Sequence, residues 1–78
     1  MGTAIDEQFT VWRLTPAERE VALGLLRGSG HKQIAAATGR SERTVRQHAV
    51  AVYEKSGCDG RAALAAFFLG GLDLPTRS

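Results

Sequence analysis

Residues 42–56 carry side chains whose types and spacing suit the recognition of nucleic-acid bases. On a helix, positions 43, 46, 47, 50 and 54 share one face. They hold Arg43, Arg46, Gln47, Val50 and Glu54. Arginine and glutamine have forked hydrogen-bonding groups that match guanine and adenine edges in the DNA major groove, and valine can contact a thymine methyl group. This face is therefore a candidate DNA-reading surface, although a merely solvated face is the commoner reading of an arbitrary helix.

The residues before this face predict a sharp turn between two helices. A helix at residues 31–38 and the helix at residues 42–56 are separated only by Gly39-Arg40-Ser41, which predicts a helix-turn-helix. Gly39 suits the left-handed conformation that ends a helix. Ser41 is a favourable N-cap for the helix that follows.

The angle between these two helices depends on three small or compact residues. Ala35 is small where the helices cross, Gly39 makes the turn, and Val45 points back into the angle. This spacing of four and then six residues is the pattern of DNA-binding helix-turn-helix units. Short helical hairpins are common, so the DNA interpretation depends on the spacing and the outward face together.

Two further helices are expected around this unit. Thr15-Pro16-Ala17-Glu18 combines an N-cap hydroxyl, a proline at the first helical position and a glutamate three residues after the cap. A last helix at residues 61–70 has more apolar side chains than one face against a small core can bury. Because no segment alternates with a period of two, we expect an all-α fold of four helices. Residues 1–13 are then an N-terminal extension, residues 14–71 the domain and residues 72–78 a tail.

Composition limits the classes of function. A chain of 78 residues forms one small domain with little room for an enzyme cleft. Residues 31–61 hold six Lys and Arg against three acids, whereas residues 1–30 hold three against four. The basic excess therefore lies around the predicted helix-turn-helix, as expected for a surface that faces phosphates.

The remaining reactive side chains do not form a pattern that indicates chemistry. Cys58 is the single cysteine, so an internal disulfide is excluded; we expect a packed thiol in a cytoplasmic protein. His31 and His48 lack metal-ligand companions at useful spacing. We therefore expect no catalysis, no metal and no cofactor. The longest strongly apolar run is too short to cross a bilayer, and we expect no membrane contact.

A longer series of residues matches a known pattern in order. It begins with Leu-Thr-Pro-Ala-Glu-Arg-Glu-Val at residues 14–21. It continues with Gly28, Lys32, Ile34, Ala35, Ser41, Thr44, Val45, Arg46, His48, Val52, Tyr53, Lys55, Gly57, Arg61 and Leu64. On these residues, positions 14–69 resemble the LuxR-type helix-turn-helix domain of bacterial transcription regulators. The resemblance implies four helices, the third in the major groove and the fourth usually pairing two protomers.

The resemblance also implies roles for individual residues. Base-reading positions are Arg46, Gln47 and Val50. Positions at or near phosphates are Lys32, Ser41, Arg43, Thr44, His48 and Lys55. Positions that would pair two protomers are Ala63, Ala66, Phe67 and Gly70. The expected partners are double-stranded DNA and a second copy of the chain, with RNA polymerase as a further candidate.

Some residues depart from the family pattern. Arg46 stands where relatives more often have lysine, which favours forked contact with guanine. Val50 occupies a place that is frequently polar or basic, so readout there is apolar or absent. The family's domain usually follows a sensing module, and the sequence leaves open whether the chain is free-standing or part of a longer protein.

Two rival functions and one rival packing remain open from the sequence. The chain could be a sigma-factor-like promoter-binding domain, although the motif at residues 14–21 speaks against it. It could instead be a helical protein–protein module that uses residues 61–70 without DNA. The apolar surplus of residues 61–70 could also be covered by residues 1–13, through Phe9 and Trp12, rather than by a second protomer.

Overall fold

The computed structural model describes residues 4–73, and the side-chain surroundings of residues 4–69. Every regular element in this part of the chain is helical, which confirms the all-α prediction. The elements are α1 (Ala4–Val11), α2 (Pro16–Leu26), α3 (His31–Thr38), α4 (Glu42–Ser56) and α5 (Arg61–Asp73). The four expected helices are α2 to α5, and α5 continues three residues beyond the expected end at Gly70.

The start of α2 has the reciprocal cap that its sequence predicts. The Glu18 backbone N–H donates to Thr15 Oγ1 over 3.2 Å, and the Thr15 backbone N–H donates to Glu18 Oε1 over 2.9 Å. Pro16 occupies the first helical position, where its missing N–H costs nothing. Two otherwise unpaired donors are thus satisfied locally, which fixes where α2 begins.

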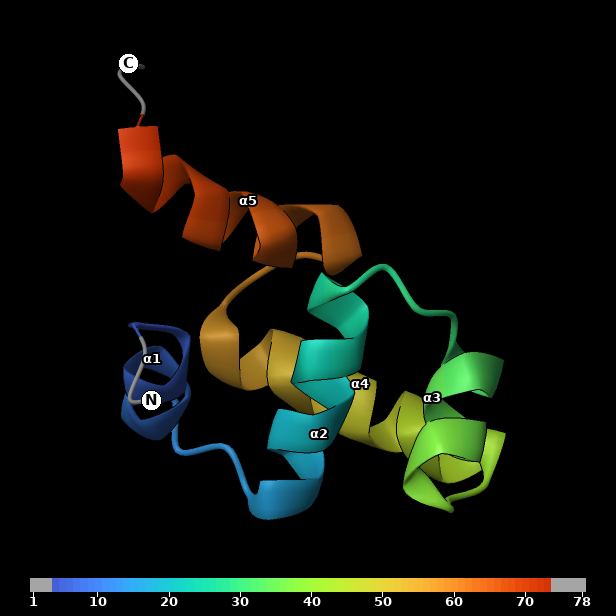
Figure 1. The fold of residues 1–78 in the computed structure, drawn as a ribbon. Coiled ribbons are helices and arrows are strands. Elements are labelled where there is room, and N and C mark those ends of the chain that lie inside the picture. Colours follow the sequence, from blue (N-terminus) through green and yellow to red (C-terminus); the bar gives the residue numbers. More distant parts are fainter. Residues whose placement is uncertain (1–3, 74–78) are drawn as a thin grey trace.

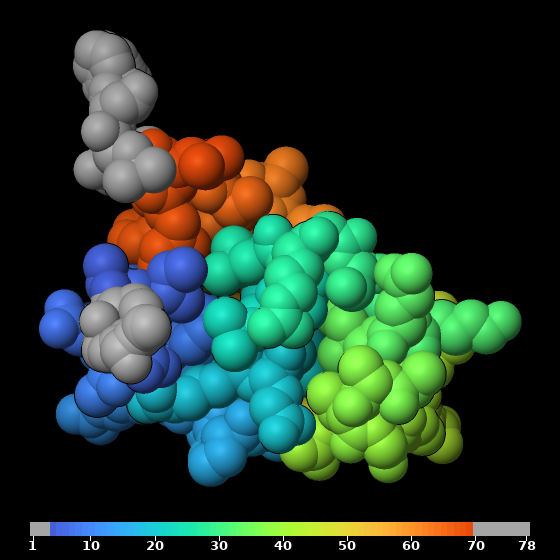
Figure 2. All heavy atoms as spheres, viewed as in Figure 1, coloured from blue at the N-terminus to red at the C-terminus, as the bar shows by residue number. Residues whose placement is uncertain are grey.

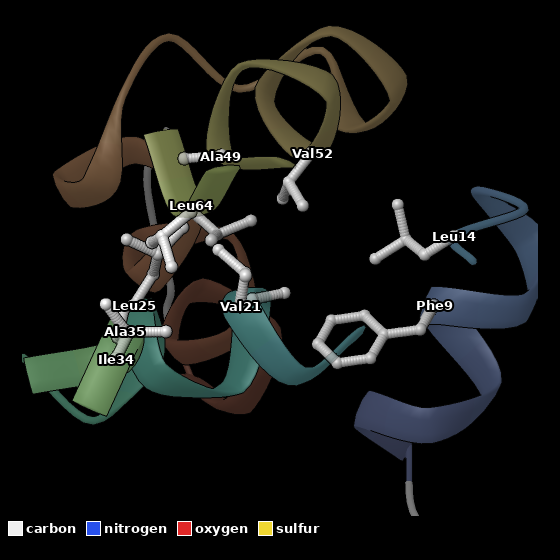
Figure 3. Packing of buried hydrophobic residues seen from close by; sticks show 11 residues of the cluster. Phe9, Leu14, Val21, Leu25, Ile34, Ala35, Ala49, Val52 and Leu64 are labelled. Carbon is white, nitrogen blue, oxygen red and sulfur yellow. The ribbon is translucent and has the colours of Figure 1, made fainter. Parts of the chain in front are cut away.

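Helix α4 crosses the middle of the molecule and connects its two sides. Figure 1 shows it running behind α2, from α3 on one side toward α1 on the other. Leu25 of α2 and Leu64 of α5 are fully buried. Figure 3 shows Phe9 of α1 directed toward Val21 of α2. The buried apolar core consists of Phe9, Leu14, Val21, Ala22, Leu25, Ile34, Ala35, Val45, Ala49, Val52 and Leu64.

The helix α1 is a feature that the sequence analysis did not predict. Residues 1–13 were expected to be an extension without a sustained period, yet residues 4–11 are helical. Ile5, Phe9 and Trp12 lie at helical spacing and pack on or in the core. Asp6 and Glu7 lie in the first turn, where negative charge favours the helix dipole.

An aromatic cluster joins α1 to α5. The Phe9 ring meets the Phe68 ring edge-on at 6.0 Å between centroids, and the Trp12 ring lies 5.2 Å from Phe67 and 5.8 Å from Phe68. In Figure 2 the blue atoms of α1 lie against the orange atoms of α5, away from the green atoms of α3. The alternative packing, in which Phe9 and Trp12 cover residues 61–70, is therefore observed at Phe67 and Phe68. No helix among the described residues is long and apolar enough to cross a membrane.

Candidate nucleic-acid interface

The turn between α3 and α4 has the geometry that its residues predict. Gly39 adopts a left-handed conformation with φ of 73°, and both its N–H and that of Arg40 donate to the Ala35 carbonyl. Ala35 is 8% exposed and Val45 fully buried, so small and compact residues do lie where the two helices meet. Short side chains here let α3 and α4 pack closely, which makes the pair a helix-turn-helix.

The outward face of α4 is open to solvent. Arg46 has 65% of its side chain exposed and Val50 is 55% exposed. Arg43 and Gln47 are also exposed, whereas Val45, Ala49 and Val52 on the opposite side of the helix are buried. At about 1.5 Å per residue the helix is about 22 Å long, enough to lie along one segment of the major groove. All three predicted base-reading residues therefore lie on one accessible face.

The N-terminal end of this face contains an acid that the sequence analysis left without a role. The Arg46 Nη2 donates to Glu42 Oε2 over 3.1 Å. Glu42, Arg43, Arg46 and Gln47 line a shallow, open hollow at this end of α4. Because the two charged residues are four apart on a helix, their spacing was the signal that could have revealed the pair.

The helix start offers donors to an anion. The Thr44 N–H donates to Ser41 Oγ over 3.1 Å, and Ser41 Oγ donates to Thr44 Oγ1 over 2.9 Å. The other N–H groups of the first turn have no partner within the helix. They point outward with the positive end of the helix dipole. Ser41 and Thr44 thus shape a helix terminus that suits a phosphate.

The other predicted phosphate residues differ in their accessibility. Lys32 is exposed in the first turn of α3, which packs against α4. Arg43 is exposed and His48 half-buried on α4 itself. Arg40, in the turn, is engaged by Glu20 of α2 through a 2.9 Å ion pair. Lys32 and Arg43 are therefore accessible to a ligand, and His48 is accessible only in part.

Lys55 is held elsewhere, in an internal network at the other end of α4. Its Nζ donates to Glu18 Oε1 over 2.7 Å and to the Arg13 carbonyl over 3.4 Å. Burial raises the pKa of the Glu18 carboxyl, but the Lys55 hydrogen bond, the Thr15 N–H and the nearby charges of Lys55 and His48 outweigh it, so the net pKa is below the ordinary 4.5. This geometry favours a structural role for Lys55 over a phosphate contact.

We expect Lys55→Met to lower the free energy of unfolding by about 1–2 kcal/mol near pH 7. Breaking a buried ion pair costs more than this, but the Lys55 side chain is 36% exposed and water screens the loss. Because the folded pKa of Glu18 lies below its unfolded value, the stabilisation is present above pH 4.5 and lost as the pH falls through the folded value. Urea unfolding from neutral pH downward should show the two proteins converge.

The matched control for this prediction is Glu18→Gln, which keeps the reciprocal cap with Thr15 and removes the charge. It should flatten the pH dependence of stability in the same acidic range. A gap between wild type and Lys55→Met that stays constant through that range would mean that the Glu18 carboxylate does not hold Lys55.

The predicted protomer-pairing residues lie on α5 in different surroundings. Ala63 is half-buried and Ala66 exposed, whereas Phe67 is 48% exposed although it touches Trp12. Gly70 lies outside the residues whose side-chain surroundings are described. Leu69 is 64% exposed, so α5 keeps an apolar outer side even with α1 in place. Cys58 is a half-buried thiol packed against the core, as expected.

Comparison with known proteins agrees with the helix-turn-helix geometry. The family model described as bacterial regulatory proteins, luxR family, matches residues 13–68. The chain belongs to that family, and it is therefore a helix-turn-helix DNA-binding protein of the regulatory class. No curated protein and no solved structure matches it significantly. In the described part of the chain, no three of His, Cys, Asp or Glu lie together as metal ligands would.

Proposed function

We propose that the protein is a sequence-specific transcription regulator that reads the DNA major groove with α4. The observation that carries the proposal is the exposed face of α4, where Arg46, Gln47 and Val50 stand opposite the buried Val45 and Ala49. Arg46 would contact the O6 and N7 of guanine, Gln47 an adenine edge, and Val50 a thymine methyl group. These contacts would supply discrimination between sequences.

Phosphate contacts would supply most of the affinity and position α4 in the groove. Ser41, Thr44 and the free N–H groups at the start of α4 suit one phosphate. Lys32, Arg43 and His48 suit phosphates on either side of the helix. Lys55 has the weakest claim, because binding DNA through its ammonium would compete with Glu18.

We further propose that two copies bind together through α5. The exposed Ala66, the half-exposed Phe67 and the exposed Leu69 support this proposal, since apolar surface left on a small domain commonly marks a contact with a partner. Ala63 and Gly70 complete the proposed interface. A two-fold dimer would read two half-sites related by the same symmetry. A regulator of this kind would act in the bacterial cytoplasm. RNA polymerase stays a candidate partner, to which no residues are assigned.

The experiment that tests the proposal is selection of bound sequences from a random DNA duplex pool. The affinities of the selected sequences would then be followed over a range of salt concentrations. We expect an enriched two-fold-symmetric motif whose binding weakens steeply with salt and needs no RNA polymerase. A single enriched half-site would remove the dimer and keep the DNA proposal. Absence of both enrichment and salt-sensitive binding would refute DNA recognition and favour a protein–protein role for α5.

Lys32→Ala should weaken binding evenly across sequences and reduce the salt dependence by about one unit of slope. The reason is that Lys32 lies on α3, outside the base-reading face, where it can neutralise a phosphate but not read a base. Binding isotherms at several salt concentrations measure the slope. The control is Arg27→Ala, an exposed cation beyond the end of α2, which should leave the slope unchanged. An unchanged slope for Lys32→Ala would remove Lys32 from the interface.

A further inference from the structure

Glu42 places a negative charge at the N-terminal end of the proposed DNA-facing surface. It is the first residue of α4, and its Oε2 accepts a hydrogen bond from Arg46 Nη2 at 3.1 Å. The Glu42 side chain is 42% exposed and that of Arg46 65% exposed. Both line the shallow hollow at the N-terminal end of the helix, with Arg43 and Gln47. The acid therefore lies next to the side chain proposed to read guanine.

Helix stability gives only a modest reason for an acid at this position. An exposed ion pair of this kind contributes about 0.2–1 kcal/mol, and an acid in the first turn adds a similar small gain from the dipole. Against this, a carboxylate that faces DNA repels the phosphates. The Glu42 carboxylate is, however, hydrogen-bonded to Arg46, so it can influence which contacts Arg46 makes.

An arginine side chain on a DNA-facing helix has two competing partners. It can reach a phosphate, which carries no sequence information, or a guanine edge, which does. Its guanidinium has five N–H donors in one plane. One of them, on Nη2, donates to Glu42, which restrains the guanidinium and leaves donors on both terminal nitrogens for the O6 and N7 of guanine.

We propose that Glu42 is a specificity-determining residue that orients Arg46 toward guanine and disfavours its contact with phosphate. The inference rests on the proposed function, because it assigns the role of Glu42 within the same DNA-reading face. Glu42 acts through Arg46. Its negative charge lowers the overall affinity for DNA and increases the discrimination at one base pair.

The test compares wild type, Glu42→Ala and Glu42→Gln on four duplexes that differ only at the base pair read by Arg46. That base pair is the one at which Arg46→Ala loses its preference. We expect Glu42→Ala to bind the three non-preferred duplexes more tightly, so that discrimination falls by roughly tenfold. Glu42→Gln should reduce discrimination as well, since it removes the charge and keeps the shape. In an Arg46→Ala background, the Glu42 substitution should have no effect on discrimination.

The matched control is Glu7→Gln, an exposed acid on α1 and outside the α4 face. It changes the net charge equally, so it should change the affinity for all four duplexes by the same factor. Unchanged discrimination in Glu42→Ala, or an equal fall in Glu7→Gln, would overturn the role of Glu42. If wild type enriches no sequence at all, the proposed function fails; if it enriches a motif and the Glu42 variants discriminate as wild type does, this inference alone fails.

Discussion

Phe9→Ala is expected to lower the free energy of unfolding by about 3 kcal/mol, the largest stability effect that we predict. The Phe9 ring is 1% exposed and meets Trp12 and Phe68 as well as the core. Truncation to alanine leaves a cavity between α1 and the rest of the domain. The loss lies at the low end of the range for phenylalanine because α1 makes few contacts with the other helices and can detach rather than enclose an empty space.

Urea unfolding followed by circular dichroism measures this loss. The control is Val11→Ala, on the same helix but 70% exposed, which should change stability by less than about 0.5 kcal/mol. The folded baseline of Phe9→Ala should also contain less helix, since α1 has only eight residues and is too short to persist alone. Equal stability of the two variants would show that α1 is not docked on the domain in solution.

Arg46→Ala is expected to cost about 1–3 kcal/mol of DNA-binding free energy, concentrated at one base pair. The Arg46 side chain is mostly exposed and outside the core, so folding should be unaffected. In its proposed role Arg46 makes a forked contact with one base pair that the other three base pairs cannot offer equally well, and the substitution deletes that contact. Competition binding with duplexes substituted one position at a time measures the distribution of the loss.

Two companion variants separate base reading from charge. Arg46→Lys keeps the positive charge but lacks the planar fork, so it should recover affinity more than discrimination. Arg43→Ala removes another exposed cation from α4 and should weaken all sequences alike. A loss in Arg46→Ala that is uniform across sequences would make Arg46 a phosphate contact and leave Gln47 and Val50 as the candidate readers.

Much of the fold could be predicted because the residues that begin and end its helices act on their neighbours in sequence. Thr15 and Glu18 cap α2 within four residues, Gly39 takes the left-handed conformation that its type favours, and Ser41 caps α4. Each of these signals involves residues close together in sequence, so each can be recognised without knowledge of the tertiary structure. The apolar spacing of α4 likewise identified its buried side.

The features that were missed depend on contacts between distant residues. Helix α1 forms because Phe9 and Trp12 pack against α5, nearly sixty residues further along, and a single short helix carries too little periodicity to be recognised alone. The pair of Glu18 and Lys55 joins the start of α2 to the end of α4. No spacing rule selects one lysine among several exposed cations for a partner so far away in sequence.

The residues of the candidate site could be predicted from the sequence, but the ion pair within it could not. The outward positions of Arg46, Gln47 and Val50 follow from helical period alone, and the structure places all three in solvent. The pairing of Glu42 with Arg46 was not predicted, because a spacing of four residues permits an ion pair without requiring one. The hydrogen bond between Glu42 and Arg46 shows that the face is mixed in charge rather than uniformly basic.

The aromatic cluster between α1 and α5 gives the molecule an optical reporter of its own. Trp12 is the single tryptophan of the chain, and its ring packs against both Phe67 and Phe68 of α5. Indole emission shifts to longer wavelength when the ring enters water. Release of α1 would therefore be visible as a red shift, and burial of α5 by a second copy as a blue shift, with no dye attached and no label near α4.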